Sequence, residues 1–256
     1  MEQNLSKKTR TESDLIGSRE VPESALYGVQ TLRGIENFRI SKFHLNEYPL
    51  FIQALAITKM GAAVANRELE LLTEEQTDAI LKACKEILEG KHHDQFPVDM
   101  IQGGAGTTTN MNANEVIANR ALELMGHARG EYQYCSPNDH VNRSQSTNDA
   151  YPTAIHIGLY YTHLKLVKHF ATLIEAFRKK GAEFAHIIKM GRTQLEDAVP
   201  MTLGQTFNGF ASILEHELKN LDFAAQDFLT VNMGATAIGT GITAEPEALN
   251  VIALKA

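Results

Sequence analysis

Three short polar segments hold the residues of this chain that are best suited to chemistry. They are residues 103–110 (GGAGTTTN), 144–149 (SQSTND) and 191–194 (GRTQ). Each segment is rich in small hydrogen-bond donors and comes just before a run of residues with helical spacing. Backbone N–H groups of a glycine-rich turn, hydroxyl groups and the start of a helix together favour an anionic oxygen. Three such segments, far apart in the sequence, predict a small polyanion that is bound at several points.

The first and third segments also have plain structural interpretations. Residues 103–110 could form a tight turn that is capped by Thr109 or Asn112. In the functional interpretation they form a carboxylate site, in which Thr107 is the best-placed hydroxyl. Residues 191–194, taken alone, are better explained as a polar loop between helices. The prediction therefore depends on the set of segments and not on any one of them.

The second segment, residues 144–149, has the composition of an N-cap before a long helix, for which Asn148 or Asp149 would be sufficient. A cap alone does not explain why three more hydroxyl residues share the same turn. These residues are Ser144, Ser146 and Thr147. The excess of hydroxyl groups favours a binding role for this turn.

Composition excludes several classes of protein. The chain has 256 residues, of which 43% are hydrophobic and 21% charged, and this is ordinary for a globular protein. A net charge of -7 without a basic run argues against a nucleic-acid partner. Residues 1–8 lack the apolar core of a secretion signal, and no apolar stretch is long enough to span a membrane. Cys84 and Cys135 are expected to be free thiols, so we predict a cytoplasmic protein without a membrane partner.

The first half of the chain predicts short helices after an irregular arm. The arm reaches about Phe38 and includes one short hairpin. Helical spacing begins at Phe51, and the sequence TEEQ from Thr73 has the form of a capping box before a helix that stops at Gly90. A further helix is expected to start near Asn112 and to run to Gly126.

The second half predicts long helices. Apolar residues recur with helical spacing from Ile155 to Ile188 and again from Leu203 to Phe228, which is typical of a helical bundle. Two such helices do not close a bundle, so others must come from outside this chain. Residues 246–256 are expected to start a helix that ends without a cap, which favours a truncated chain over the alternative of a natural helical C-terminus. The sequence therefore predicts a mainly α fold, with an irregular and helical domain at 1–142 and an incomplete helical-bundle domain at 143–256.

Other candidate motifs are weak. His92 and His93 have no acidic or thiol neighbours at metal-ligand spacing, so we expect no metal site there. The G-x-G fragment at 239–241 has no preceding strand and no third glycine, so a dinucleotide site is poorly supported.

Four ordered motifs are similar to those of the fumarase/aspartase superfamily, and the similarity runs through nearly the whole chain. They are residues 102–115 (QGGAGTTTNMNANE), 137–149 (PNDHVNRSQSTND), 190–205 (MGRTQLEDAVPMTLGQ) and 234–241 (GATAIGTG). The resemblance implies a homotetramer whose central helices form one large bundle, with each active site built from loops of three subunits. It implies neither a cofactor nor a metal.

The resemblance also implies a reaction and a set of contacts. The reaction is the reversible anti-elimination of ammonia from L-aspartate to give fumarate, through an aci-carboxylate intermediate that preorganised donors stabilise. The positions in this chain that match the substrate contacts of the superfamily are Thr107, Ser146, Thr147, Asn148, Thr193 and Gln194.

Three positions separate the aspartase branch from the class II fumarase branch. Fumarases usually have histidine where this chain has Gln194, serine where it has Ala105, and a histidine of a second anion site where it has Ser136. These differences favour an aspartase. The alternatives are a class II fumarate hydratase and a non-catalytic structural or binding homologue.

The serine loop of the superfamily, of G-S-S-x-M-P-x-K-x-N-P type, does not occur in these 256 residues. That loop supplies the catalytic base, so no catalytic residue is assigned in this chain and the serine base is expected beyond Ala256. This chain alone is therefore expected to be inactive.

Overall fold

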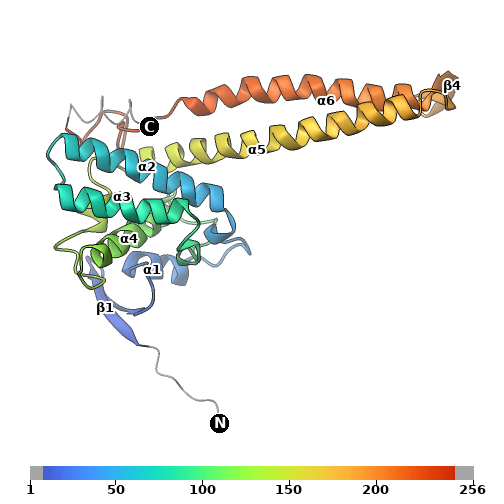
Figure 1. The fold of residues 1–256 in the computed structure, drawn as a ribbon. Coiled ribbons are helices and arrows are strands. Elements are labelled where there is room, and N and C mark those ends of the chain that lie inside the picture. Colours follow the sequence, from blue (N-terminus) through green and yellow to red (C-terminus); the bar gives the residue numbers. More distant parts are fainter. Residues whose placement is uncertain (1–7, 246–256) are drawn as a thin grey trace, which may run out of the picture. The chain divides into compact units, whose positions relative to one another are not determined.

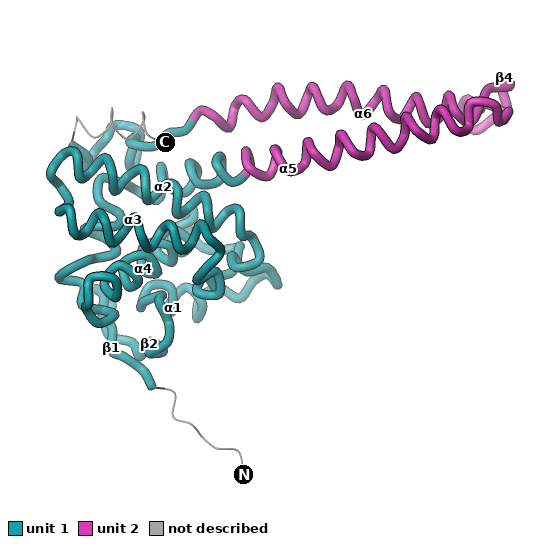
Figure 2. The backbone as a smooth tube through the Cα atoms, viewed as in Figure 1, with its two compact units in different colours: residues 1–158, 231–256 teal, residues 159–230 magenta. Residues whose placement is uncertain are grey.

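A computed structural model describes residues 8–245, which form two compact units (Figure 2). Unit 1 comprises residues 8–158 and 231–245, and unit 2 is Leu159–Thr230. Both units are built mainly from helices, as the sequence predicts. The domain boundary expected near residue 142 stays a prediction. The helix expected at 246–256 lies outside the described residues.

Unit 1 opens with the predicted hairpin, followed by a helical body (Figure 1). The hairpin pairs β1 (Thr9–Asp14) with β2 (Gly17–Pro22) in antiparallel register. The helices and helical turns that follow it are α1 (Val29–Asn37), η1 (Leu45–Glu47), α2 (Pro49–Glu68), α3 (Glu74–Leu88), η2 (His93–Gln95), α4 (Thr107–Leu124) and η3 (Pro137–Val141). The long helix α5 (Thr147–Glu183) begins in unit 1 and continues into unit 2.

Helix α3 is confirmed with the predicted cap. The Thr73 hydroxyl accepts from the Gln76 N–H at 3.2 Å, and the Gln76 side chain accepts from the Thr73 N–H. This capping box needs only residues three apart in sequence, so it is visible in the sequence.

Helix α1 was not predicted, because a distant residue caps it. Its N-cap residue Gly28 makes no side-chain cap. Instead, the buried Glu115 carboxylate of α4 accepts from the N–H groups of Gly28 and Gln30 at 2.8 Å and of Thr31 at 3.0 Å. Three bonds to the positive end of the helix replace a local cap.

Helix α4 begins at Thr107, not near Asn112 as the sequence suggested. Gly106 precedes it with φ +88°, a left-handed conformation that a residue with a Cβ seldom adopts. A Cβ at this position would also overlap the Tyr151 ring. Residues 104–106 form the turn before the helix, and the polar residues 107–110 are part of the helix.

The core of unit 1 lies where α3 packs against α2 and α4 (Figure 1). Its largest fully buried apolar side chains belong to Leu45, Ile52, Leu55, Ile80, Ile87, Phe96, Ile117 and Leu122. This core gives α2 and α4 fixed positions, and both helices carry polar residues of the site described below.

Unit 2 is a helical hairpin with a β-hairpin at its turn. It contains the rest of α5, then β3 (Ile188–Thr193), β4 (Glu196–Thr202), α6 (Leu203–Ala225) and η4 (Gln226–Leu229). The two long helices are confirmed, but Ile188 lies in β3 and Phe228 in the 3-10 turn η4. Residues 191–194, favoured as a loop when taken alone, belong mostly to a strand.

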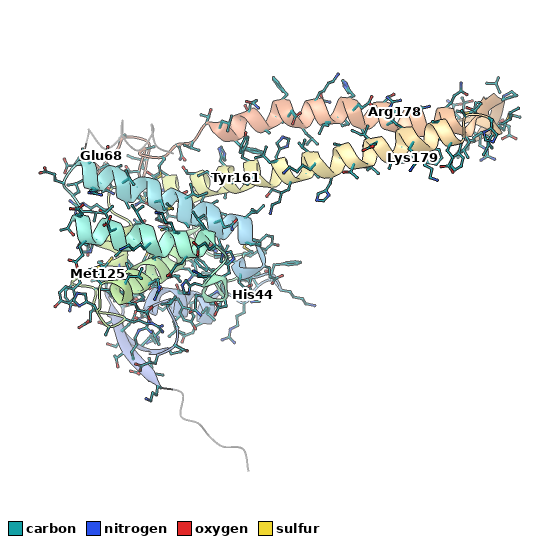
Figure 3. All side chains as sticks on the ribbon, in the orientation of Figure 1. His44, Glu68, Met125, Tyr161, Arg178 and Lys179 are labelled. Atoms are coloured by element: carbon teal, nitrogen blue, oxygen red, sulfur yellow. The ribbon has the colours of Figure 1, made fainter. Side chains whose placement is uncertain are left out.

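Side chains join α5 to α6 within unit 2 (Figure 3). Arg178 forms an ion pair with Glu215 at 2.7 Å, and four phenylalanine rings contact one another beside it. These rings belong to Phe177, Phe184, Phe207 and Phe210. Among residues 8–245, no helix combines the length and the apolar character needed to cross a membrane.

Candidate functional site

A fully buried lysine joins three segments of unit 1. Lys59 lies on α2 with no exposed surface. Its Nζ donates to Asn110 Oδ1 at 2.8 Å, and to Asn142 Oδ1 and Gln145 Oε1 at 2.9 Å each. An ammonium has three protons, so these three amide oxygens satisfy it completely. Burial lowers the pKa of Lys59 to about 7, against the attraction of the Asp149 carboxylate.

The lysine network reaches a hydroxyl that the sequence predicts as a binding residue. Asn110 Nδ2 donates to Thr147 Oγ1 and to Asn142 Oδ1, both at 3.1 Å. Thr147 is the first residue of α5 and is half-buried. The first and second polar segments are therefore hydrogen-bonded to each other, although 37 residues separate Asn110 from Thr147.

Ser146 and Asp149 cap α5. The Ser146 hydroxyl accepts from the Asn148 N–H at 3.2 Å, and Asp149 Oδ1 accepts from the Ser146 N–H at 2.9 Å. The cap was expected from Asn148 or Asp149, but Ser146 holds the N-cap position and Asp149 completes the capping box. One lone pair of the Ser146 oxygen therefore serves the helix.

The buried Asp149 carboxylate also fixes a distant loop beside the start of α5. Its second oxygen accepts from the N–H groups of Gly234 at 3.1 Å and Thr236 at 2.9 Å. Asn148 is tied to the same loop, because its Nδ2 donates to the Ala237 carbonyl at 2.8 Å. The motif at 234–241 thus supports the second polar segment.

Thr107 is the first residue of α4. The N–H groups in the first turn of a helix have no partner within the helix, so other groups must accept from them. The N–H of Thr109 donates to Gln102 Oε1 at 2.7 Å, and that of Asn110 to the Gly106 carbonyl at 2.9 Å. The Thr107 side chain is exposed. An exposed hydroxyl at the positive end of a helix suits an anionic oxygen.

Thr193 and Gln194 lie in unit 2, at the turn between β3 and β4. Thr193 pairs with Glu196, and the two turn residues are Gln194 (φ +49°) and Leu195 (φ +69°). Two left-handed residues in a two-residue loop form a turn that usually contains asparagine and glycine. Both predicted binding residues are exposed on this hairpin. Of the six predicted residues, the structure brings Ser146, Thr147 and Asn148 together in one turn of unit 1.

A cavity of about 690 Å³ lies elsewhere in unit 1, between the β1–β2 hairpin, α1, α4 and residues 136–138 at the start of η3. Arg33 lines it and is paired with Asp14 at 2.8 Å. Ser136 and Asn138 also line it. Ser136 is the residue that replaces the second-site histidine in the resemblance, and its hydroxyl donates to Asp139 Oδ2 at 2.9 Å.

Sequence reasoning missed Lys59, Asn142 and the supporting role of Asp149. Lys59 resembles an ordinary polar residue in a helical run, so its residue type alone does not indicate burial. The available signal was its place on the helix, because Lys59 lies on the same face as Leu55 and Ala62, which are both buried.

Comparisons with known proteins give a consistent result. The chain matches the family described as "Lyase" over residues 17–255. It is 58% identical to the aspartate ammonia-lyase of Pseudomonas fluorescens, over 93% of this chain and 50% of that protein. It is 54% identical to the aspartate ammonia-lyase of Escherichia coli strain K12, over 95% of this chain and 51% of that protein. The chain spans about half the length of these curated relatives.

Solved structures agree with the sequence relatives. The fumarate lyase:delta crystallin from Brucella melitensis bound to cobalt has a TM-score of 0.92 at 50% identity, over 97% of this chain and 54% of that one. The recombinant class II fumarase from Schistosoma mansoni has a TM-score of 0.87 at 34% identity, over 96% of this chain and 52% of that one.

Proposed function

We propose that a full-length protein containing this chain converts L-aspartate to fumarate and ammonia. The chain belongs to the lyase family that it matches over residues 17–255. The observation that carries the proposal is the 58% identity to an aspartate ammonia-lyase over 93% of the chain. Ala105 and Gln194, which stand where fumarases usually have serine and histidine, support the same choice.

In the proposed reaction, residues of this chain bind and orient the substrate. Thr107 at the start of α4 and Thr147 at the start of α5 donate to substrate carboxylates, where helix dipoles add to the attraction. Ser146 and Asn148 lie beside Thr147, and Thr193 and Gln194 come from the hairpin of unit 2. Donors fixed before the reaction stabilise the dianion that forms when a proton leaves the carbon next to the β-carboxylate. The serine base comes from outside these residues.

We further propose that the protein acts as a homotetramer with shared active sites. Unit 2 supports this, because many large apolar side chains of α5 and α6 are exposed in the single chain. They include Leu159, Tyr161, Leu164, Leu173, Phe210, Ile213 and Phe223. Long helices with exposed apolar faces need neighbours, and other copies of the same helices provide them. A cytoplasmic location is compatible with the free thiols of Cys84 and Cys135.

The test is a spectrophotometric assay of the full-length protein. With L-aspartate, ultraviolet absorbance should rise as fumarate forms, and ammonia should appear in equal amount. The Thr107→Ala variant should lower kcat/KM about 10- to 100-fold through the loss of a hydrogen bond to a charged group. Thr11→Ala, which removes an exposed hydroxyl of the hairpin, is the matched control and should leave kcat/KM unchanged.

Two results would contradict the proposal. Efficient hydration of fumarate to malate, with aspartate left untouched, would show a fumarate hydratase. Absence of turnover with either substrate in a folded tetramer would show a non-catalytic homologue.

A further inference from the structure

We infer that Lys59 and Asn110 are positioning residues that set the direction of the Thr147 O–H bond, so that this hydroxyl donates to a carboxylate of the ligand. The ligand class rests on the proposed function. The direction of the hydroxyl rests on hydrogen bonds within unit 1.

The first step is the orientation of the Asn110 amide. In its protonated form, Lys59 Nζ carries only donors, so every group that hydrogen-bonds to the ammonium must offer an oxygen. Asn110 Oδ1 lies 2.8 Å from Nζ, and the other two contacts are also amide oxygens. The ammonium therefore excludes the rotated form of the Asn110 amide, in which nitrogen would face nitrogen.

The second step is the role left to Thr147. With its oxygen on Lys59, Asn110 must direct its nitrogen towards Asn142 Oδ1 and Thr147 Oγ1. The two amide protons match these two acceptors. Thr147 Oγ1 accepts one of them, so its own proton points away from Asn110. Within residues 8–245, no hydrogen bond from this hydroxyl to a protein group is found.

The third step is the strength of the resulting donor. The Lys59 charge polarises the Asn110 amide, and a polarised N–H bonded to Oγ1 makes the Thr147 O–H a better donor. The half-buried hydroxyl also stands at the first position of α5, near the positive end of that helix. Each of these effects favours a negatively charged acceptor in front of Thr147.

Three variants of the full-length protein test this chain of bonds. Asn110→Asp keeps an oxygen on Lys59 but replaces the donor to Thr147 with an acceptor, so the hydroxyl turns inward. Thr147→Val removes the hydroxyl, and Thr147→Ser keeps it. The matched control is Asn119→Asp, the same change on the same helix, where the amide contacts Leu26, Gly130 and Tyr132 instead.

The probe is succinate, an unreactive dicarboxylate, and its affinity is measured by titration calorimetry. We expect Asn110→Asp and Thr147→Val each to weaken binding about 10- to 100-fold, as for one lost hydrogen bond to a charged group. The double variant should be no weaker than Thr147→Val alone. Thr147→Ser should restore most of the affinity that Thr147→Val loses, and Asn119→Asp should bind like the unchanged protein even where it lowers the melting temperature. Additive losses in the double variant, or normal affinity of Asn110→Asp beside a weak Thr147→Val, would overturn the inference and leave the proposed function intact.

Neutron diffraction tests the hydroxyl without any ligand. Deuterium on Thr147 Oγ1 should point away from Asn110, and two deuterium atoms should be seen on Asn110 Nδ2. A hydroxyl deuterium that points to Asn110 would overturn the inference. If the unchanged protein neither binds succinate nor acts on aspartate, the proposed function fails, and this measurement still decides the direction of the hydroxyl.

Discussion

The fully buried ammonium of Lys59 donates three hydrogen bonds, each to an amide oxygen. The arrangement satisfies the ammonium, but the lysine still loses its hydration. Its pKa of about 7 reflects that loss. The residue therefore influences stability in a way that depends on pH.

Replacing Lys59 with methionine should destabilise the protein at pH 7 by about 3–5 kcal/mol, because three buried amide oxygens lose their donor. Urea unfolding of the variant and of the unchanged protein measures this. Lys82→Met, on the exposed side of α3, is the control and should change the free energy of unfolding by less than about 0.5 kcal/mol.

The same pair of proteins should show a pH dependence. The folded chain releases the Lys59 proton near pH 7, whereas the unfolded chain keeps it up to the ordinary value of 10.5. Between these values the unfolded state binds more protons, so the free energy of unfolding rises with pH. The stability difference between the unchanged protein and Lys59→Met should therefore increase from pH 7 to pH 10, by at most ~1.4 kcal/mol per pH unit. A difference that falls over this interval would contradict the assignment.

At the scale of elements, α1 depends on a carboxylate of α4. Glu115 is buried, and its carboxylate accepts from the backbone N–H groups of Gly28, Gln30 and Thr31. Burial raises its pKa, and the N–H groups oppose that rise. Helix α1 is therefore held by tertiary contacts and not by its own sequence.

Glu115→Gln should release α1 while it leaves α3 folded, because the new amide offers only one acceptor oxygen to three N–H groups. We expect faster hydrogen exchange at Gly28, Gln30 and Thr31, and a loss of about 1.5–3 kcal/mol of stability. Glu75→Gln, in the exposed first turn of α3, is the control. Equal acceleration of exchange in α1 and α3 would show a general loss of stability instead.

Elements differed in how far the sequence could predict them, and the reason is the range of their contacts. The α3 cap and the long helices of unit 2 follow from residues three to seven apart. The N-terminal cap of α1 comes from a residue 84–87 positions away, and β3 and β4 form a largely exposed hairpin without a clear alternation of apolar residues. The turn at Thr147 was predicted as a binding turn from its hydroxyl groups, and that role stays a prediction, whereas Lys59 behind it became visible only in the fold.

At the scale of the whole molecule, the predicted binding residues are divided between two units, and the chain spans about half the length of its curated relatives. The proposed active site needs loops from several subunits and a serine base from outside these residues. In the proposed function, a single copy of this chain therefore supplies binding groups without a base.

The isolated 256-residue chain should show no turnover of L-aspartate above the blank, even at high protein concentration. The full-length protein in the same assay is the positive control. Turnover by the isolated chain would contradict this prediction and would direct attention to His140, which is half-buried, with its pKa lowered by burial. His140→Gln would then show whether that imidazole is the base.

The lysine network also has a consequence for the order in which unit 1 folds. Lys59 binds partners that are 51, 83 and 86 residues further along the chain. Contacts of such range close large loops, and they form later than local ones such as the α3 cap. The hydroxyl of Thr147 gains its direction only when α2, α4 and the turn before α5 have met. We therefore expect the proposed competence to bind an anion to be among the last properties that unit 1 acquires as it folds.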